Sequence, residues 1–200
     1  MLHFVMMFAA TAIIDSVSAH NGAHVVIRHG AVQHVSGDTR CYSTRMSGHE
    51  LVIDNPGNCS RDERGVIEVV TPSLSAVAVS NGGSLQASGA FPAQPSIEAA
   101  VEQGGTIDIR FIAAQRVTAS VYSGGRIFVN ARNTLDATID SGGVVTYWGE
   151  ARDVRKSVYN GGVVQRGAED DAFSAETPTS TANPCRDSTK RSRYRRESCR

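Results

Sequence analysis

The sequence has no excess charge of either sign, because its 20 Lys and Arg residues are balanced by 20 Asp and Glu residues. A protein that binds the nucleic-acid backbone needs a strong surplus of basic side chains, so the composition argues against nucleic-acid partners. Aromatic residues make up only 6% of the chain, and a core must therefore consist mainly of aliphatic side chains. No apolar run approaches the roughly 20 residues of a membrane-spanning helix, and no membrane span is predicted.

Motifs for catalysis and cofactor binding are also missing. None of the Gly-Gly pairs is followed by the Gly-Lys-Ser/Thr sequence that completes a phosphate-binding loop. The four cysteines lack the Cys-X-X-Cys spacing of structural zinc sites. We therefore predict no catalytic residue, no resident metal and no cofactor.

Residues 1–19 have the features of an export signal. The apolar stretch FVMMFAATAII has the length of a signal-peptide core. Val17 and Ala19 place small residues at positions −3 and −1 of a cleavage site before His20. The sequence therefore predicts a chain exported to the periplasm, the cell surface or the extracellular space.

The predicted export affects the expected state of the four cysteines. In an oxidising compartment an even number of cysteines favours disulfides. Cys41 and Cys59 are the candidate pair, although four cysteines allow three pairings and the sequence does not choose among them. The other two cysteines, Cys185 and Cys199, flank the basic stretch of a tail, residues 169–200, that we expect to be disordered. Whether this tail has a function stays open.

Five Gly-Gly pairs recur at spacings of 22, 20, 18 and 19 residues, which indicates a repeat architecture. Around each pair, aliphatic residues alternate with polar ones, as in a half-buried strand. Glycine reaches the positive φ angles of a sharp corner at low cost. The predicted structural corners are Gly82, Gly83, Gly104, Gly105, Gly124, Gly125, Gly142, Gly143, Gly161 and Gly162.

These repeats predict an all-β chain folded as a parallel β-solenoid, or β-helix, with rungs of about 20 residues over residues 72–168. Residues 20–71 contain strand-like runs without a glycine pair, and we interpret them as irregular opening rungs or a small β cap. The last rung is polar, since Lys156 and Arg166 fall in its inward columns. A polar end protects the exposed strand edges, so the solenoid should end near residue 168.

Three phrases, GVIEVVTPSLSAVAVSNGGSLQASG, VYSGGRIFV and IDSGGVVTY, resemble the autotransporter adhesin head family, or GIN domain. In that family a strand, a proline-containing turn and a short hydrophobic phrase lead into glycine-rich β-solenoid rungs. The similarity covers about residues 45–168. It implies an exported periplasmic or surface protein for which the family has no established catalytic residues.

One outward column lies two residues before the glycine pairs: it begins at Ser80 and continues with Glu102, Tyr122, Asp140 and Tyr159. Because neighbouring rungs are about 4.8 Å apart, the last four side chains would form an exposed ladder. Tyrosine rings can stack on sugar rings, and carboxylates can accept hydrogen bonds from hydroxyls. The ladder is therefore a candidate site for a glycan or another envelope component, although a solvated face that serves only solubility has the same pattern.

We predict an exported, non-enzymatic β-solenoid of the bacterial cell envelope or surface, with a binding, adhesion or scaffolding role. The alternative is a polysaccharide-acting enzyme, a lyase or hydrolase, in which Glu102 and Asp140 form the carboxylate pair. A third possibility is a copper-binding amino terminus, with His20 exposed by cleavage and His24 nearby. The ligand, the host and the oligomeric state are left open by the sequence.

Overall fold

The computed structural model describes residues 13–37, 40–57, 59 and 65–168. All regular structure in this part of the chain is β-strand, so the all-β prediction is confirmed, and it contains no helix that could cross a membrane. The strands form a single sheet. They are β1 (Ser16–His20), β2 (His24–His29), β3 (His34–Gly37), β4 (Ser43–Ser47), β5 (Glu50–Asp54), β6 (Ile67–Thr71), β7 (Ala76–Ser80), β8 (Ser84–Ser88), β9 (Gln94–Glu102), β10 (Thr106–Ser123), β11 (Arg126–Ser141), β12 (Val144–Trp148), β13 (Asp153–Val158) and β14 (Val163–Arg166).

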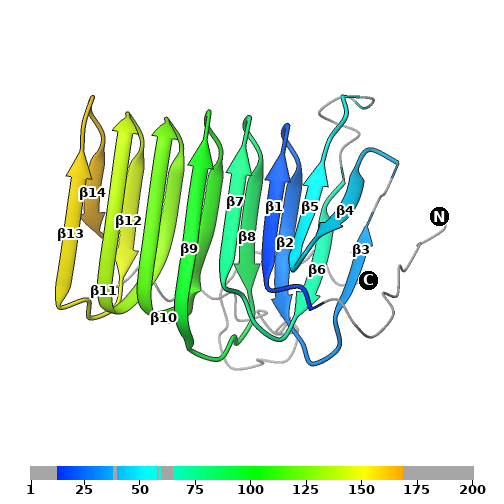
Figure 1. Cartoon of the computed structure of the whole chain (residues 1–200), viewed down its shortest axis with the longest axis horizontal. Helices are drawn as coiled ribbons and strands as arrows, with labels where there is room; N and C mark the ends of the chain where they lie inside the picture. Colours follow the sequence, from blue (N-terminus) through cyan, green and yellow to red (C-terminus); the bar gives the residue numbers. More distant parts are fainter. Residues whose placement is uncertain (1–12, 38–39, 58, 60–64, 169–200) are drawn as a thin grey trace, which may run out of the picture.

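The sheet curls over on itself, so that two rows of strands enclose a common core (Figure 1). The first row runs β5, β1, β7, β9, the C-terminal parts of β10 and β11, and then β13. The second row runs β6, β2, β8, the N-terminal parts of β10 and β11, and then β12 and β14. The long strands β10 and β11 belong to both rows and join them into one sheet.

The sheet as a whole is mixed, so the predicted parallel β-solenoid is not confirmed as the architecture of the described residues. Two of its pairings are antiparallel, those of β3 with β6 and of β4 with β5, and the others are parallel. β4 turns directly into β5 through Gly48 and His49, a connection too short for a parallel crossover. β3 and β4 both lie at the same end of the molecule (Figure 1). This end is thus covered by strands that are not part of the repeat.

The order of strands in space differs from their order in the chain. β1 pairs with β5 on one side and β7 on the other, and β2 lies likewise between β6 and β8. Residues 16–20 and 24–29 therefore lie inside the sheet rather than at its end. Residues 16–19, which precede the predicted cleavage site, are part of β1.

The inward columns predicted from the alternating pattern are buried. Val79, Val101, Val121 and Ile139 are at most 1% exposed, and they lie three residues before successive glycine pairs. Each such side chain contributes roughly 1.5–3 kcal/mol when it is removed from water. The last repeat departs from this pattern, since Val158 at the equivalent position is 42% exposed. The side chain of Lys156 in β13 donates a hydrogen bond to the carbonyl oxygen of Val164 in β14, at 3.0 Å.

The glycine pairs lie in the short turns that join first-row strands to second-row strands. Gly142 and Gly143 have φ angles of 69° and 107°, a region that side chains disfavour. A Cβ atom on Gly143 would lie 2.6 Å from Cγ1 of Val121 and 3.1 Å from the carbonyl oxygen of Gly125. A Cβ atom on Gly142 would meet no atom within 4 Å. The second glycine is therefore required by packing as well as by backbone angle.

Cys41 and Cys59 form a disulfide, as the candidate pairing anticipated. Near it, the hydroxyl of the buried Tyr42 donates a hydrogen bond to the carbonyl oxygen of Gly65, at 2.7 Å. Both contacts connect the segment around β4 to the segment that leads into β6. The predicted tail, with Cys185 and Cys199, lies outside the described residues.

Candidate binding surface

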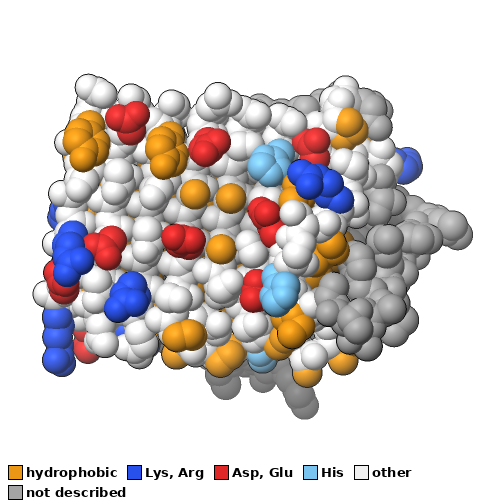
Figure 2. Space-filling view, viewed as in Figure 1, with side chains coloured by type: hydrophobic (Ala, Val, Ile, Leu, Met, Phe, Trp, Pro, Cys, Tyr) orange, Lys and Arg blue, Asp and Glu red, His pale blue; other side chains and the backbone are white. Residues whose placement is uncertain are grey.

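The structure brings the four predicted ladder residues together on adjacent strands. The strand registers pair Val101 with Val121, Val121 with Ile139, and Ile139 with Val158. The residues that follow these positions, Glu102, Tyr122, Asp140 and Tyr159, therefore lie side by side. We call these four residues the acid–tyrosine ladder. Acidic side chains and side chains of the hydrophobic class alternate along one edge of the first-row face, near the turns (Figure 2).

The members of the acid–tyrosine ladder are open to solvent. The side chains of Tyr122 and Tyr159 are 52% and 63% exposed, which is high for large rings. Both carboxylates of the ladder are exposed as well. Neighbouring strands are about 4.8 Å apart, so the backbones that carry the two tyrosines lie about 10 Å apart, with Asp140 on the strand between them.

The same column continues through the predicted Ser80 to two residues that were not predicted as part of it. Ser80 pairs with Glu102, and His20 pairs with Asp54 on β5. The His20 ring nitrogen Nδ1 lies 2.6 Å from the hydroxyl oxygen of Ser80. The column therefore runs from Asp54 through His20 and Ser80 into the acid–tyrosine ladder. Sequence reasoning missed His20 and Asp54 because it assumed that the rungs are stacked in chain order.

A sequence signal for this extension does exist. The phrase HNGAH at residues 20–24 has the layout of SNGGS at residues 80–84, with alanine in place of the second glycine. The two phrases stack in register: Asn81 donates a hydrogen bond through Nδ2 to Oδ1 of Asn21, at 2.9 Å. Asn21 and Asn81 also share positive φ angles, of 54° and 50°. The pair Asn21-Gly22 therefore indicates an additional turn of the same kind in the earlier part of the chain.

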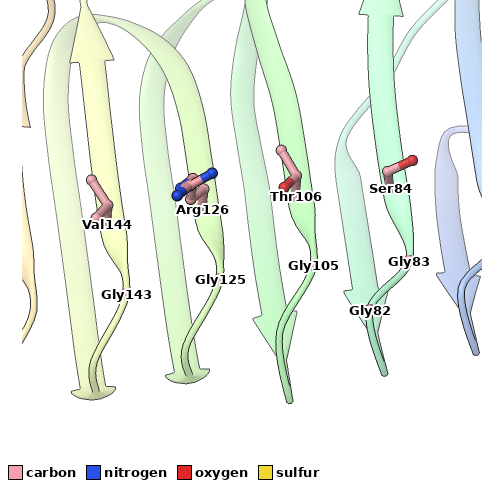
Figure 3. Close-up of a pocket in the computed structure, with 9 residues that line it drawn as sticks. All are labelled: Gly82, Gly83, Ser84, Gly105, Thr106, Gly125, Arg126, Gly143 and Val144. Atoms are coloured by element: carbon pink, nitrogen blue, oxygen red, sulfur yellow. The ribbon is translucent and has the colours of Figure 1, made fainter.

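Two hollows lie near this column. The larger is an open groove of about 490 Å³ beside the stacked glycine turns, where Ser84, Thr106, Arg126 and Val144 point outward from consecutive strands (Figure 3). The smaller hollow, of about 250 Å³, lies at the Asp54 end of the column. It is lined by His20, Asn21, Ser43, Arg45, Val52 and Asp54. The column therefore ends in a polar hollow that contains a cation and a carboxylate.

The carboxylate pair required by the enzymatic alternative is separated by a strand. Glu102 and Asp140 lie on β9 and β11, about 10 Å apart between backbones, with Tyr122 of β10 between them. Glycoside hydrolysis needs two carboxyl groups that face a scissile bond from opposite sides. Glu102 and Asp140 project from the same exposed face, and neither lines either of the two hollows. The two carboxylates therefore do not face each other across either hollow.

The histidines suggested by the copper hypothesis face serines rather than each other. Nδ1 of His24 lies 2.6 Å from the hydroxyl oxygen of Ser84, as Nδ1 of His20 does from that of Ser80. Within the described residues, no group of three or more His, Cys, Asp or Glu side chains is arranged to hold a metal ion. His20 is the last residue of β1, where it follows Ala19.

Comparison with known proteins gives one family match. Residues 93–151 match the model of the family described as "Putative auto-transporter adhesin, head GIN domain". This match confirms the resemblance for the segment that contains the phrases VYSGGRIFV and IDSGGVVTY. No curated protein matches the chain in sequence.

Several solved structures are similar to the chain at low sequence identity. One is described as "a putative adhesin" from Bacteroides fragilis, with 13% identity, a TM-score of 0.47, and coverage of 83% of this chain and 96% of that one. Another "putative adhesin", from Parabacteroides merdae, has 12% identity, a TM-score of 0.36, and coverage of 84% and 96%. A "putative lipid binding protein" from Parabacteroides distasonis has 14% identity, a TM-score of 0.34, and coverage of 84% and 96%. With TM-scores this low, the three structures carry no argument about function.

Proposed function

We propose that this protein is an exported, non-enzymatic β-solenoid of the bacterial cell envelope, and that the acid–tyrosine ladder binds a glycan or another envelope component. The exposed alternation of two tyrosines and two carboxylates on consecutive strands carries this proposal. The ladder provides flat rings for the apolar faces of sugars and acceptors for their hydroxyl groups. It lies on a rigid sheet, so little conformational entropy is lost when a ligand binds.

The solenoid part of the proposal is supported by the parallel pairings and by the position of the turns. Strands in both rows pair with the equivalent strand about one repeat further along the chain from β9 onward. Each such repeat changes row at a glycine pair. In this description β3 and β4 are additions at one end that cover the edges of β6 and β5.

The adhesion and export parts are supported by the family that residues 93–151 match, whose description names an autotransporter adhesin head. The disulfide between Cys41 and Cys59 agrees with an oxidising compartment. The exposure of the ladder agrees with a surface that meets large, extended molecules. We infer a location in the periplasm or on the cell surface.

The test is a binding screen of the full chain against immobilised lipopolysaccharide, peptidoglycan fragments and capsular polysaccharides. We expect Tyr122→Ala to weaken binding to the selected probe roughly 10-fold, because it removes a stacking ring. Tyr122→Phe keeps the ring and should bind nearly as the parent does. If Tyr122→Ala binds like the parent, the ladder is not the site.

A matched pair on β9 tests the carboxylates. Glu102 belongs to the ladder, whereas Glu98 lies four residues earlier on the same strand and is also exposed. Glu102→Gln should weaken binding several-fold, and Glu98→Gln should leave it unchanged. Equal losses in both variants would indicate nonspecific electrostatic attraction. Turnover of a polysaccharide that Asp140→Asn abolishes would instead establish the enzymatic alternative.

A further inference from the structure

The smaller hollow, at the Asp54 end of the column, has the size and the chemistry of a binding site for one small group. We call it the Arg45 hollow; its lining residues are His20, Asn21, Ser43, Arg45, Val52 and Asp54. Its volume of about 250 Å³ lies below the roughly 300–1,000 Å³ of pockets that enclose a whole drug-sized ligand. The hollow therefore has room for a single sugar-sized unit rather than for an entire glycan.

Three neighbouring strands build the Arg45 hollow, and their registers determine which side chains meet in it. β4 pairs Ser43 with Asp54 and Arg45 with Val52, both on β5, and His20 of β1 pairs with Asp54 from the other side. Side chains alternate along a strand, so Val52 points to the same outer face as Asp54. Val52 is nevertheless only 5% exposed. It gives the hollow an apolar floor between polar side chains.

The charged groups of the hollow are not paired with each other. Basic, acidic and histidine side chains gather over β1, β4 and β5 at this end of the first-row face (Figure 2). Within the residues that the structure describes, the exposed Arg45 guanidinium has neither a hydrogen bond nor an ion pair. Oδ1 of Asp54 accepts a hydrogen bond from Nδ2 of Asn21 at 2.7 Å, and Oδ2 has no partner in the same described part. The hollow thus offers a cationic donor and a carboxylate acceptor to a ligand.

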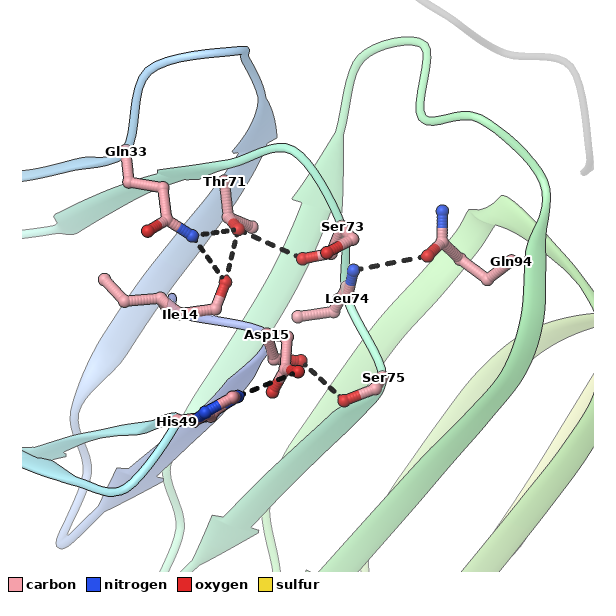
Figure 4. A network of polar contacts seen from close by, with 9 residues as sticks. All are labelled: Ile14, Asp15, Gln33, His49, Thr71, Ser73, Leu74, Ser75 and Gln94. Atoms are coloured by element: carbon pink, nitrogen blue, oxygen red, sulfur yellow. Dashed lines mark hydrogen bonds and ion pairs between the residues drawn. The ribbon is translucent and has the colours of Figure 1, made fainter. Parts of the chain in front are cut away.

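The strands that carry these groups are also fixed at their other ends (Figure 4). Just before β1, the carbonyl oxygen of Ile14 accepts a hydrogen bond from the Thr71 hydroxyl, at 2.5 Å. The backbone N–H of Asp15 donates to the carbonyl oxygen of His49, which directly precedes β5, at 3.3 Å. β1 and β5 are therefore joined at both ends, and the hollow needs little reorganisation when it binds a ligand.

The lining of the hollow suits a sugar that carries a carboxylate. A guanidinium binds a carboxylate through two parallel hydrogen bonds. The Asp54 carboxylate accepts hydrogen bonds from hydroxyl groups but repels a bare anion. Val52 can contact the apolar C–H groups of a sugar ring. A sugar acid combines all three features, because it carries an anionic group, hydroxyl donors and an apolar ring face on one small unit.

We propose that the Arg45 hollow is the subsite for one acidic sugar at the end of a glycan whose neutral remainder lies along the acid–tyrosine ladder. This inference rests on the proposed function of the ladder. Asp54 lies three strands from Glu102, about 14 Å away between backbones, so one chain of sugars can reach both. Glu102 and Asp140 repel further acidic units, whereas Arg45 attracts one. The ligand class is therefore a glycan with a single acidic end, not a polyanion.

The first experiment titrates D-glucuronate, D-glucose, acetate and D-glucose 6-phosphate into the full chain and measures each affinity by calorimetry. We expect D-glucuronate to bind at least about 10-fold more tightly than D-glucose or acetate, because only D-glucuronate has both carboxylate and hydroxyls. D-Glucose 6-phosphate should bind more weakly than D-glucuronate, since Asp54 opposes its larger charge. Equal affinities for D-glucuronate and D-glucose, or tighter binding of the phosphate, would overturn the assignment of a carboxylate.

A matched pair of exposed arginines tests the cation. Arg45→Gln should weaken D-glucuronate binding at least about 10-fold, because the charge and the paired donors are lost. Arg116 lies on β10, far from the hollow, and is also exposed. Arg116→Gln should bind D-glucuronate as the parent does. Unaltered binding in Arg45→Gln, or equal losses in both variants, would overturn the inference.

The role of Asp54 is tested by a ratio of two affinities. Asp54→Ala removes both the hydroxyl acceptor and the charge that repels anions. Acetate should therefore bind more tightly than to the parent, and the preference for D-glucuronate over acetate should fall several-fold. An unchanged preference would show that the hollow does not recognise the hydroxyls, and the assignment of a sugar would be wrong.

Tyr122→Ala separates this inference from the proposed function. Tyr122 lies four strands from Asp54, so the variant should bind D-glucuronate like the parent while it loses affinity for the longer glycan probe. If the longer probe depends on Tyr122 but D-glucuronate does not bind, the inference fails and the proposed function stands. If D-glucuronate binding depends on Arg45 but no longer probe depends on Tyr122, the proposed function fails, and the ladder part of the inference fails with it.

Discussion

The segment of residues 72–168 and the segment of residues 13–71 build the same curled sheet by different means. In the later segment most strands pair with the strand about 20 residues further along, and glycine pairs make the turns. In the earlier segment β1 pairs with strands 34 and 60 residues away, and an Asn-Gly-Ala sequence makes the turn. The comparison teaches that a repeated packing pattern does not require a repeated sequence spacing.

The largest expected effect concerns the turns, where the two segments differ most. Gly143→Val should lower the free energy of unfolding by about 3 kcal/mol, since it adds backbone strain to a clash with Val121 and the Gly125 carbonyl. Gly142→Val, which meets open space, should cost a little over about 1 kcal/mol. Ala23 occupies the equivalent position in the earlier segment without a positive φ angle. Chemical denaturation of the parent, Gly143→Val and Gly142→Val proteins measures which substitution costs more free energy of unfolding. Ala23→Gly is the control. If Gly142→Val lowered the free energy of unfolding as much as Gly143→Val does, the packing role of Gly143 would be contradicted.

The second effect tests whether both segments share one core. Val17 in β1 and Val121 in β10 are each at most 1% exposed. Val17→Ala and Val121→Ala should each lower the free energy of unfolding by about 2 kcal/mol in a single transition, because each removes buried methyl groups. Urea unfolding followed by circular dichroism measures both. A Val17→Ala protein as stable as the parent would mean that β1 does not support the core.

The smallest effect concerns the two ends of the sheet. One end is covered by β3 and β4, whereas at the other end the side chain of Lys156 in β13 donates a hydrogen bond to the carbonyl oxygen of Val164 in β14. Lys156→Val should change the free energy of unfolding by less than about 0.5 kcal/mol. It should, however, make self-association stronger, because charged side chains on an edge oppose strand pairing between molecules. Sedimentation velocity over a range of concentrations measures this, with Lys156→Arg as the control that keeps the charge.

Sequence reasoning succeeded where neighbours in space are a constant distance apart in the chain. The columns of Val79, Val101, Val121 and Ile139 could be predicted because a period near 20 aligns residues that stack. The same constancy located the acid–tyrosine ladder. A constant period alone shows which residues of neighbouring repeats lie side by side, so the tertiary structure did not have to be known.

The rest could not be predicted, because the earlier segment has no constant offset. Ser16 pairs with Glu50 and with Ala76, and neither distance is a single repeat. The insertion of β1 and β2 between later strands, and therefore the place of His20 and Asp54 in the column, depends on packing that a linear pattern does not encode. The antiparallel pairing of β3 and β4 likewise follows from short connections and from the uncovered edges of β6 and β5.

The insertion of β1 between β5 and β7 has a consequence for how the chain folds. Loop closure over a long separation is slow, whereas a strand can add quickly to a neighbour that has just formed. His20 meets Asp54 across 34 residues and Ser80 across 60, so β1 gains its second partner strand only after β7 has been made. Stacking through β9–β12 involves shorter separations and can form early, whereas the docking of β1 between β5 and β7 comes late.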